Sequence, residues 1–307
     1  MKTVMIQKDL KYRLNIDMLT KEFLIVNNVY EADVILMLNH CSMIDVLPDD
    51  TIKKIIIIMM EAPVLSYTKT SYKYANKLHS FYCFSPQELY HKPVTTNPSL
   101  FPYNPFYLSD IRRTNTTLTK RHIFYAGKRN TFNEAREEQY GNINLYDIRI
   151  KLAEYLLKNY PETTVIGAGW NVETASNVID WHIQKLKDIE LCKADFVLCI
   201  ENSMFKDYLT EKIHDGFSSD RVVLYLGEPN VEKYIPENCF INLNKYFNKE
   251  TREFDYQKII DIITNMTQEE YDTILNNARR WRESIKGKFE EERDKFTLKL
   301  IEDIKNV

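Results

Sequence analysis

The sequence is poor in the residues that mark several common classes of protein. Of 307 residues only 7 are glycine, and the five cysteines are widely spaced, at Cys41, Cys83, Cys192, Cys199 and Cys239. This spacing contains no CxxC pair or Cys/His cluster, so it indicates neither a zinc site nor a disulfide framework. The formal net charge is −3, with lysine and arginine spread along the chain. No nucleic-acid-binding surface is therefore indicated.

Long apolar runs are missing as well. The longest aliphatic run, residues 55–60, is far shorter than the roughly 20 residues that a helix needs to span a bilayer. The N-terminal residues lack the apolar core of a signal peptide. We therefore expect a soluble, cytoplasmic protein without a membrane span.

The chain is long enough for two domains, and its apolar runs are those of an α/β protein. Hydrophobic residues make up 44% of it, enough to build real cores. Near-continuous apolar runs suit a parallel sheet covered on both faces. They predict strands at residues 33–38, 54–60, 82–84, 122–127, 163–167, 196–200, 221–226 and 239–243. Helices are expected at residues 145–159, 183–191 and 255–266 and from 268 onward.

A proline-rich segment suggests where the two domains meet. Four prolines between Lys92 and Pro105 exclude regular structure there and favour a linker. We expect an N-terminal domain over residues 1–110, a second domain over residues 111–266, and a C-terminal helical segment over residues 267–307 that packs on the body. Two α/β halves joined in this way suggest two similar sheets facing a cleft.

The most informative stretch is residues 196–213. Its apolar strand ends in Glu201 and Asn202, and a segment that begins like a helix follows. Open α/β sheets bind ligands at the carboxyl ends of their strands, which is where these polar groups collect. A solvated helix face with an exposed ion pair is the alternative. Four polar residues at spacing i, i+3, i+4 and i+7 are predicted to share one helical face: Tyr208, Glu211, Lys212 and Asp215.

Three motifs follow one another in this part of the chain. They are Glu201-Asn-Ser-x-x-x-Asp-Tyr-x-Thr-Glu-Lys212, Val-Leu-Tyr-Leu-Gly227 and Tyr234-Ile-Pro-Glu-Asn-Cys-Phe-Ile241. Together they resemble the signature of the α1,3/4-fucosyltransferase family. The resemblance covers about residues 122–245 well and the N-terminal half only sparsely. Val223 departs from it, because the family often has proline there, but a strand-entry proline can be replaced by valine without touching the chemistry.

The resemblance implies a fold, a reaction and a set of partners. The fold is two Rossmann-like domains in the GT-B arrangement. The reaction is inverting transfer of fucose from GDP-fucose to a hydroxyl of N-acetylglucosamine or glucose, most simply in α1,3 linkage, with the oligosaccharide acceptor held by the N-terminal half. No tightly bound cofactor is implied. Since no Asp-x-Asp follows an apolar strand, a divalent cation is not required, although one could stimulate turnover by shielding released GDP.

The resemblance also gives chemical roles to single residues. Glu61, which follows the strand at 54–60 and begins Glu-Ala-Pro63, matches a proposed catalytic base; an ordinary strand-terminating acid is the alternative. Lys212 and Arg149 match cations that contact the diphosphate, and a solvent-exposed arginine is the alternative for Arg149.

Three further residues match positions around the donor sugar. Glu211 would hold hydroxyls of the fucose or the ribose, since a carboxylate accepts several hydrogen bonds. Asn202 and Tyr208 would offer an amide and a phenol to the nucleotide sugar, and Tyr208 could equally pack under the base.

The remaining polar residues have simpler expected roles. Glu201 would orient the loop that follows it, and Thr210 or Asp207 would cap the helix. Lys128 and Arg129 are interpreted as a basic turn. Without a family match, Asp215 is expected on the helix surface or in an ion pair.

Two other functions stay open at this point. One is a glycosyltransferase of the same fold that uses another nucleotide sugar. The other is a non-catalytic protein that binds glycans or nucleotides at a degenerate site. The full set of polar groups from Glu61 to Lys212 argues against such decay.

Overall fold

The computed structural model describes residues 1–11, 14–38, 54–58, 78–82, 94–95, 116–129, 143–170, 175–176, 193–206, 208–285 and 288–306. The chain divides into two compact units, one of residues 1–104 with 287–307 and the other of residues 105–286. The unit boundary falls close to the expected one at residue 110. The C-terminal segment that we expected as one piece, residues 267–307, is divided between the two units.

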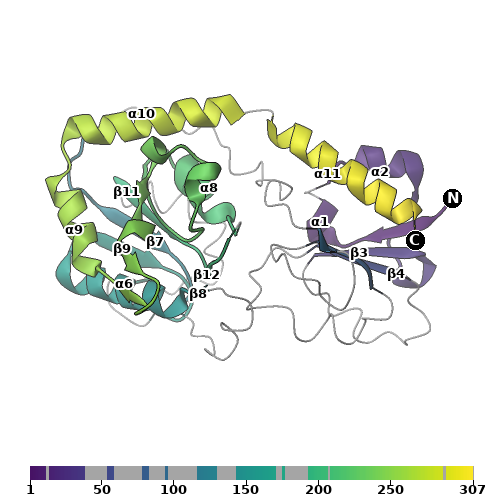
Figure 1. The fold of residues 1–307 in the computed structure, drawn as a ribbon, viewed down its shortest axis with the longest axis horizontal. Helices are drawn as coiled ribbons and strands as arrows, with labels where there is room; N and C mark the ends of the chain where they lie inside the picture. Colours follow the sequence, from purple (N-terminus) through teal and green to yellow (C-terminus); the bar gives the residue numbers. More distant parts are fainter. Residues whose placement is uncertain are drawn as a thin grey trace. The chain divides into compact units, whose positions relative to one another are not determined.

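Unit 1 is built on a six-stranded parallel sheet in the order β2-β1-β3-β4-β5-β6 (Figure 1). Consecutive strands in a parallel sheet need crossover connections, which suits the alternating pattern of the sequence. The strands are β1 (Thr3–Ile6), β2 (Leu24–Val26), β3 (Val34–Leu38), β4 (Lys54–Ile58), β5 (Leu78–Tyr82) and β6 (Val94–Thr95).

The described helices of unit 1 come from both ends of its chain. They are α1 (Lys8–Lys11), α2 (Ile16–Glu22) and α11 (Lys288–Lys305), with a 3-10 turn at Val29–Glu31. Helix α11 packs against α2 (Figure 1). Asn15, the N-cap of α2, donates two hydrogen bonds to α11 at this contact. Its backbone N–H donates to Thr297 Oγ1 at 3.0 Å, and its side-chain amide donates to Asp294 Oδ1 at 2.8 Å.

The strands of unit 1 follow the sequence predictions with four differences. β3 and β4 are confirmed, whereas β1 and β2 were not predicted, because their apolar stretches are too short to stand out. β5 begins at residue 78 instead of 82, since His79 and Ser80 interrupt its apolar pattern. β6 lies inside the segment that we expected to be irregular.

Unit 2 contains a second six-stranded parallel sheet, in the order β10-β9-β7-β11-β13-β14. Two short antiparallel pairs, β8 with β12 and β15 with β16, lie outside it. The strands are β7 (Ile123–Ala126), β8 (Ile143–Asn144), β9 (Thr163–Ile166), β10 (Ala175–Ser176), β11 (Phe196–Ile200), β12 (Ser203–Met204), β13 (Val222–Leu226), β14 (Ile241–Asn242), β15 (Phe247–Asn248) and β16 (Glu253–Phe254).

Helices cover both faces of this sheet. Helix α6 packs against β9, whereas α8 packs against β11 and β13 (Figure 1). Side chains of a strand alternate between the two faces, so Leu198 and Leu224 join the core with α6, while Cys199 and Val223 lie next to Gly216 of α8. The helices are α6 (Tyr146–Asn159), α8 (Glu211–Ser218), α9 (Tyr256–Asn265) and α10 (Gln268–Ile285), with 3-10 turns at Val231–Lys233, Glu237–Cys239 and Leu243–Tyr246.

The strands and helices predicted for unit 2 are confirmed to within a few residues wherever the structure describes them. The predicted helix at 183–191 lies outside the described residues. Among the described helices of both units, none combines the length and the apolar character that crossing a membrane requires.

Candidate functional site

Polar side chains gather where the central strands of the unit 2 sheet end. Gly127 follows β7, Glu201 and Asn202 follow β11, and Gly227 follows β13. All of these strands run parallel, so their carboxyl ends meet at one edge of the sheet. This is the edge at which open α/β sheets bind ligands.

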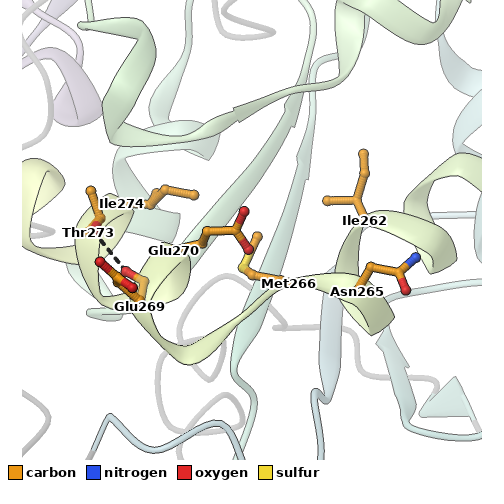
Figure 2. A pocket seen from close by; sticks show the side chains of 7 residues that line it. All are labelled: Ile262, Asn265, Met266, Glu269, Glu270, Thr273 and Ile274. Carbon is orange, nitrogen blue, oxygen red and sulfur yellow. Dashed lines mark hydrogen bonds between the residues drawn. The ribbon is translucent and has the colours of Figure 1, made fainter.

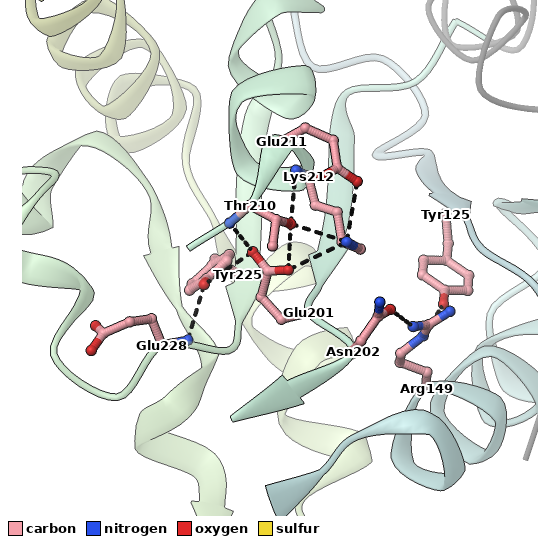
Figure 3. A network of polar contacts seen from close by, with 9 residues as sticks. All are labelled: Tyr125, Arg149, Glu201, Asn202, Thr210, Glu211, Lys212, Tyr225 and Glu228. Atoms are coloured by element: carbon pink, nitrogen blue, oxygen red, sulfur yellow. Dashed lines mark hydrogen bonds and ion pairs between the residues drawn. The ribbon is translucent and has the colours of Figure 1, made fainter. Parts of the chain in front are cut away.

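The first group at this edge is organised by Arg149. Its guanidinium donates from Nε to Tyr125 OH at 2.9 Å and from Nη1 to Asn202 Oδ1 at 2.5 Å (Figure 3). Its Nη2 donates to the Lys128 carbonyl at 3.4 Å. Only 4% of Arg149 is exposed, so the alternative of a solvent-exposed arginine is wrong. The cause is its place on α6, where positions three and four residues further on, Leu152 and Ala153, are buried as well.

The second group is organised by Glu201, whose side chain is fully buried. Its Oε1 accepts from the Thr210 N–H at 2.9 Å and from Tyr225 OH at 3.4 Å. Its Oε2 accepts from Thr210 Oγ1 at 2.5 Å and lies 3.4 Å from Lys212 Nζ. Lys212 Nζ also contacts Glu211 Oε1 at 3.2 Å and Thr210 Oγ1 at 3.0 Å (Figure 3). One ammonium is thus shared by two carboxylates and a hydroxyl.

Burial and charge act against each other at Glu201. Burial raises the pKa of its carboxyl group, and the Lys212 ammonium counteracts that rise. Burial, followed by the nearby Glu201 carboxylate, raises the pKa of Tyr225 well above its ordinary value. Tyr225 therefore stays a phenol, which donates to Glu201 and accepts from the Glu228 N–H at 3.0 Å.

The helix of this site begins later than the sequence spacing predicts. Thr210 is the N-cap of α8, and its hydroxyl accepts from the Lys212 N–H, so the predicted capping role of Thr210 is confirmed. Tyr208 precedes the helix and is fully buried. The prediction that Tyr208 shares one helical face with Glu211, Lys212 and Asp215 is therefore wrong. Spacing misled because a helical repeat has no meaning outside a helix.

Two other expectations change with burial. Asp215 is only 2% exposed, so the expected place on the helix surface is wrong, while the expected ion pair stays a prediction. Arg129 is exposed and pairs with Glu154 at 3.0 Å, which fits the basic turn that the sequence suggested. Between Asn202 and α8, where we expected a polar loop, the chain forms β12, which pairs with β8.

The structure brings four of the predicted side chains into two neighbouring groups. Arg149 and Asn202 are in contact with each other, and Glu211 and Lys212 are in contact with each other. Glu61 and Asp207 lie outside the described residues. Sequence reasoning missed Tyr125 and Tyr225 as members of these groups. The sequence does contain a signal for them, since each tyrosine stands two residues before the glycine that follows its strand.

Two surface pockets of unit 2 lie elsewhere. One of about 510 Å³ sits where α9 meets α10, and Figure 2 shows its lining: Ile262, Asn265, Met266, Glu269, Glu270, Thr273 and Ile274. Several polar groups that line this pocket form hydrogen bonds within α9 or α10. Asn265 donates to the Asp261 carbonyl, Thr273 donates to the Glu269 carbonyl, and Glu270 accepts from the Thr267 N–H at the start of α10. The other, of about 590 Å³, is lined by Lys151 and residues of the β15–β16 hairpin.

Metal ligands do not cluster in the parts of the chain that the structure describes. No group of three or more histidine, cysteine, aspartate or glutamate side chains there could hold an ion.

Two parallel α/β sheets, one with a compact polar site at the carboxyl ends of its strands, define a protein of the Rossmann-like α/β class. A family model described as glycosyltransferase family 10 (fucosyltransferase), C-terminal part, matches residues 138–300, more than half of the sequence. The chain belongs to this family. The matched region contains Arg149, Glu201, Asn202 and Lys212, which form the two groups of the site.

Curated relatives match over a shorter region. The 4-galactosyl-N-acetylglucosaminide 3-alpha-L-fucosyltransferase 9 of Homo sapiens is 40% identical over 75 residues, which are 24% of this chain and 20% of that protein. The alpha-(1,3)-fucosyltransferase FucT of Helicobacter pylori is 32% identical over 84 residues, which are 27% of this chain and 17% of that protein. The chain thus matches about a fifth of the length of these relatives.

A solved structure matches over most of the chain. A crystal structure of alpha1,3-fucosyltransferase superposes with a TM-score of 0.57 and 16% identity, covering 89% of this chain and 81% of that one. At this identity the likeness concerns the fold. The predicted fold class, α/β with two Rossmann-like domains of the GT-B type, is confirmed.

Proposed function

We propose that the protein is an inverting fucosyltransferase that moves L-fucose from GDP-fucose to a hydroxyl of an oligosaccharide containing N-acetylglucosamine or glucose. The observation that carries this proposal is the group around Lys212 at the carboxyl end of β11, inside the region that matches the fucosyltransferase family. Both curated relatives carry names that specify 3-linkage of fucose, which favours α1,3 transfer here.

The donor is assigned to unit 2, with different side chains for its different parts. Lys212 and Arg149 supply positive charge for the diphosphate, and phosphate oxygens are strong acceptors for both. The N-terminus of α8 adds a favourable field for negative charge next to Lys212. Glu211, whose side chain is 37% exposed, offers a carboxylate to sugar hydroxyls, and Asn202 offers an amide.

Tyr208 is fully buried. It has no exposed surface with which to meet a ligand in the arrangement described here. We therefore assign Tyr208 a packing role beneath the nucleotide.

The chemical step needs a base on the acceptor side, and we assign it to Glu61. Its carboxylate takes the proton of the acceptor hydroxyl as the oxygen bonds to the anomeric carbon and the bond from that carbon to the diphosphate breaks. Positive charge develops on the sugar ring and negative charge on the departing GDP, which Lys212 and Arg149 stabilise. Glu61→Ala should then abolish transfer while leaving GDP binding close to normal. Wild-type turnover in that variant would overturn the assignment.

One assay tests the function as a whole. The protein is incubated with GDP-fucose and a panel of N-acetyllactosamine, its β1,3 isomer and lactose, and the products are analysed for a deoxyhexose mass increment. An increment on any of them supports fucose transfer, and linkage analysis of that product tests the α1,3 assignment.

Calorimetry separates the alternatives if the panel shows no product. Titration with GDP, UDP and ADP, then with GDP-fucose and GDP-mannose, identifies the donor. If another nucleotide sugar bound more tightly than GDP-fucose, that sugar would be the proposed donor instead. Binding without turnover of any donor would leave a non-catalytic binding protein, and no binding at all would contradict a donor site.

A further inference from the structure

The side chain of Glu201 has no contact with solvent. It follows β11, remains tied to β13 through its N–H to the Leu226 carbonyl, and is fully buried. Its two oxygens receive hydrogen bonds from the Thr210 N–H, the Thr210 hydroxyl and the Tyr225 hydroxyl, and Oε2 also faces the Lys212 ammonium (Figure 3). A group in this position does not reach a ligand by itself.

We propose that Glu201 is a positioning residue, which fixes Lys212 and the first turn of α8 for the donor diphosphate, and that Glu211 is the carboxylate that gives way when the diphosphate binds. The inference deepens the proposed function and rests on it. It divides two carboxylates that both touch Lys212 into a permanent partner and an exchangeable one.

The difference in exposure between the two carboxylates carries this division. Glu201 Oε2 lies 3.4 Å from Lys212 Nζ with none of its side chain exposed, while Glu211 Oε1 lies 3.2 Å from the same nitrogen with 37% of its side chain exposed. Glu211 can turn into solvent or toward sugar hydroxyls without leaving a buried charge. Glu201 cannot, since a buried carboxylate that loses its donors is strongly destabilised.

Packing also holds Glu201 in place. A Cβ added to Gly227 would come within 2.4 Å of Glu201 Cγ and within 2.5 Å of Tyr225 OH. The glycine at the end of β13 therefore leaves just enough room for the Glu201 side chain. This wall and the Thr210 contacts fix the direction in which the carboxylate meets Lys212.

The surroundings of the Glu201 side chain favour a carboxylate, because every group that contacts its two oxygens is a hydrogen-bond donor. A carboxylate accepts on both oxygens, whereas the glutamine amide would turn an N–H₂ donor toward one pair of these groups. Glu201→Gln therefore disturbs Thr210 and Lys212 even though it keeps the size of the side chain. Glu211→Gln has no such consequence, because its side chain borders solvent.

The test compares these two substitutions with inorganic pyrophosphate and GDP as probes. If only the charges mattered, both substitutions would increase the affinity for the anionic probes, since each removes one negative charge near the ligand. If Glu201 positions Lys212, the two substitutions should change this affinity differently. Glu201→Gln should weaken binding of both probes about tenfold, whereas Glu211→Gln should leave pyrophosphate affinity unchanged or increase it. Isothermal titration calorimetry measures both affinities.

Two more variants separate positioning from general loss of stability. Asp220→Asn alters another buried acid, which pairs with Arg279 at the other end of β13, and should lower the melting temperature without changing pyrophosphate or GDP affinity. In the Lys212→Ala background, Glu201→Gln should add little further loss, because Glu201 acts through Lys212. Thr210→Val, with Thr210→Ser as its conservative partner, removes the shared hydroxyl and tests the same link if Glu201→Gln does not fold.

The outcomes distinguish this inference from the proposed function. If the wild-type protein binds neither GDP nor pyrophosphate, the donor site itself fails. If it binds them and Glu201→Gln binds as tightly or more tightly, or if its effect adds fully to that of Lys212→Ala, the positioning role is wrong. Equal weakening by Asp220→Asn would show that lost stability, not position, explains the effect.

Discussion

Glu201 and Asn202 are neighbours in the chain, and their side chains belong to different polar groups. Glu201 meets Thr210 and Lys212 at the start of α8, while Asn202 meets Arg149 on α6 (Figure 3). The Asn202 carbonyl also accepts from Leu145, directly before α6. Two consecutive residues at the end of β11 thus tie together the helices on the two faces of the sheet.

Arg149 provides the first prediction. Arg149→Lys should weaken GDP binding about tenfold and destabilise unit 2. The single nitrogen of an ammonium cannot reach all three acceptors, the Tyr125 hydroxyl, Asn202 Oδ1 and the Lys128 carbonyl, which three separate nitrogens of the guanidinium bind. Calorimetry and thermal unfolding measure the two effects. The matched control is Arg129→Lys, at an exposed arginine paired with Glu154. Equal GDP affinity in Arg149→Lys and wild type would remove Arg149 from the donor site.

Lys212 provides the second prediction. Lys212→Ala should lower GDP affinity by about tenfold or more, since it removes a cation expected at the diphosphate and leaves the Glu201 and Glu211 carboxylates facing that charge. Lys249→Ala, at an exposed lysine beside the β15–β16 hairpin, is the control and should bind like wild type. A steeper dependence on ionic strength in wild type than in Lys212→Ala would support a direct charge contact. Unchanged affinity contradicts it.

The ion pair at the opposite end of β13 gives a prediction about stability alone. Asp220 is 1% exposed at its side chain and receives two hydrogen bonds from Arg279, at 2.8 and 2.6 Å. Arg279→Ala leaves that carboxylate buried without its guanidinium and should cost about 3 kcal/mol of unfolding free energy. Urea unfolding followed by a probe in unit 2 measures this. Arg129→Ala, which removes an exposed pair with Glu154 in the same unit, should change nothing measurable, and a similar loss in both variants would speak against the burial argument.

His214 predicts a loss of stability in acid. Burial lowers its pKa to about 3, and its ring stacks on Trp281 with centroids 6.1 Å apart. Between about pH 6.5 and pH 3 the unfolded chain binds a proton at this histidine that the folded chain does not. The stability from neutral His214 is therefore fully present above pH 6.5 and is lost as the pH falls, at up to about 1.4 kcal/mol per pH unit.

The comparison that checks this prediction uses His214→Gln. Urea unfolding at several pH values from 7 to 4 should show a shallower pH dependence in the variant than in wild type. The titratable neighbours Glu211 and Arg282 are unchanged in both proteins, so they do not account for a difference. Parallel curves would show that His214 takes up its proton without unfolding.

The elements of unit 2 were predictable because apolar residues report burial directly. Every residue of β11 and β13 is buried, and the two strands appear in the sequence as unbroken apolar runs. The start of α8 was not predictable in the same way. Tyr208 and Glu211 have helical spacing, but the helix begins only after Thr210, which is still extended. Thr210 donates its hydrogen bonds to Glu201, which follows β11 and lies nine residues earlier in the sequence.

Some residues of the site could be predicted from the sequence and others could not. Lys212 and Asn202 stand in a motif that a family resemblance covers. The hydrogen-bond partners of Arg149, Tyr125 and Asn202, are 24 and 53 positions away in the sequence, and only the folded chain brings them into contact. Long-range partners of this kind leave no local pattern.

Helix α11 has a consequence for how the protein is made. Unit 1 needs α11, which packs on α2 and whose Ile304 and Lys305 carbonyls accept from the side chain of Lys2. Unit 2 is one uninterrupted segment that leaves the ribosome earlier than α11. During vectorial synthesis unit 2 can therefore finish folding first, while the strands of unit 1, although made earlier, gain their last helix only after unit 2 has emerged.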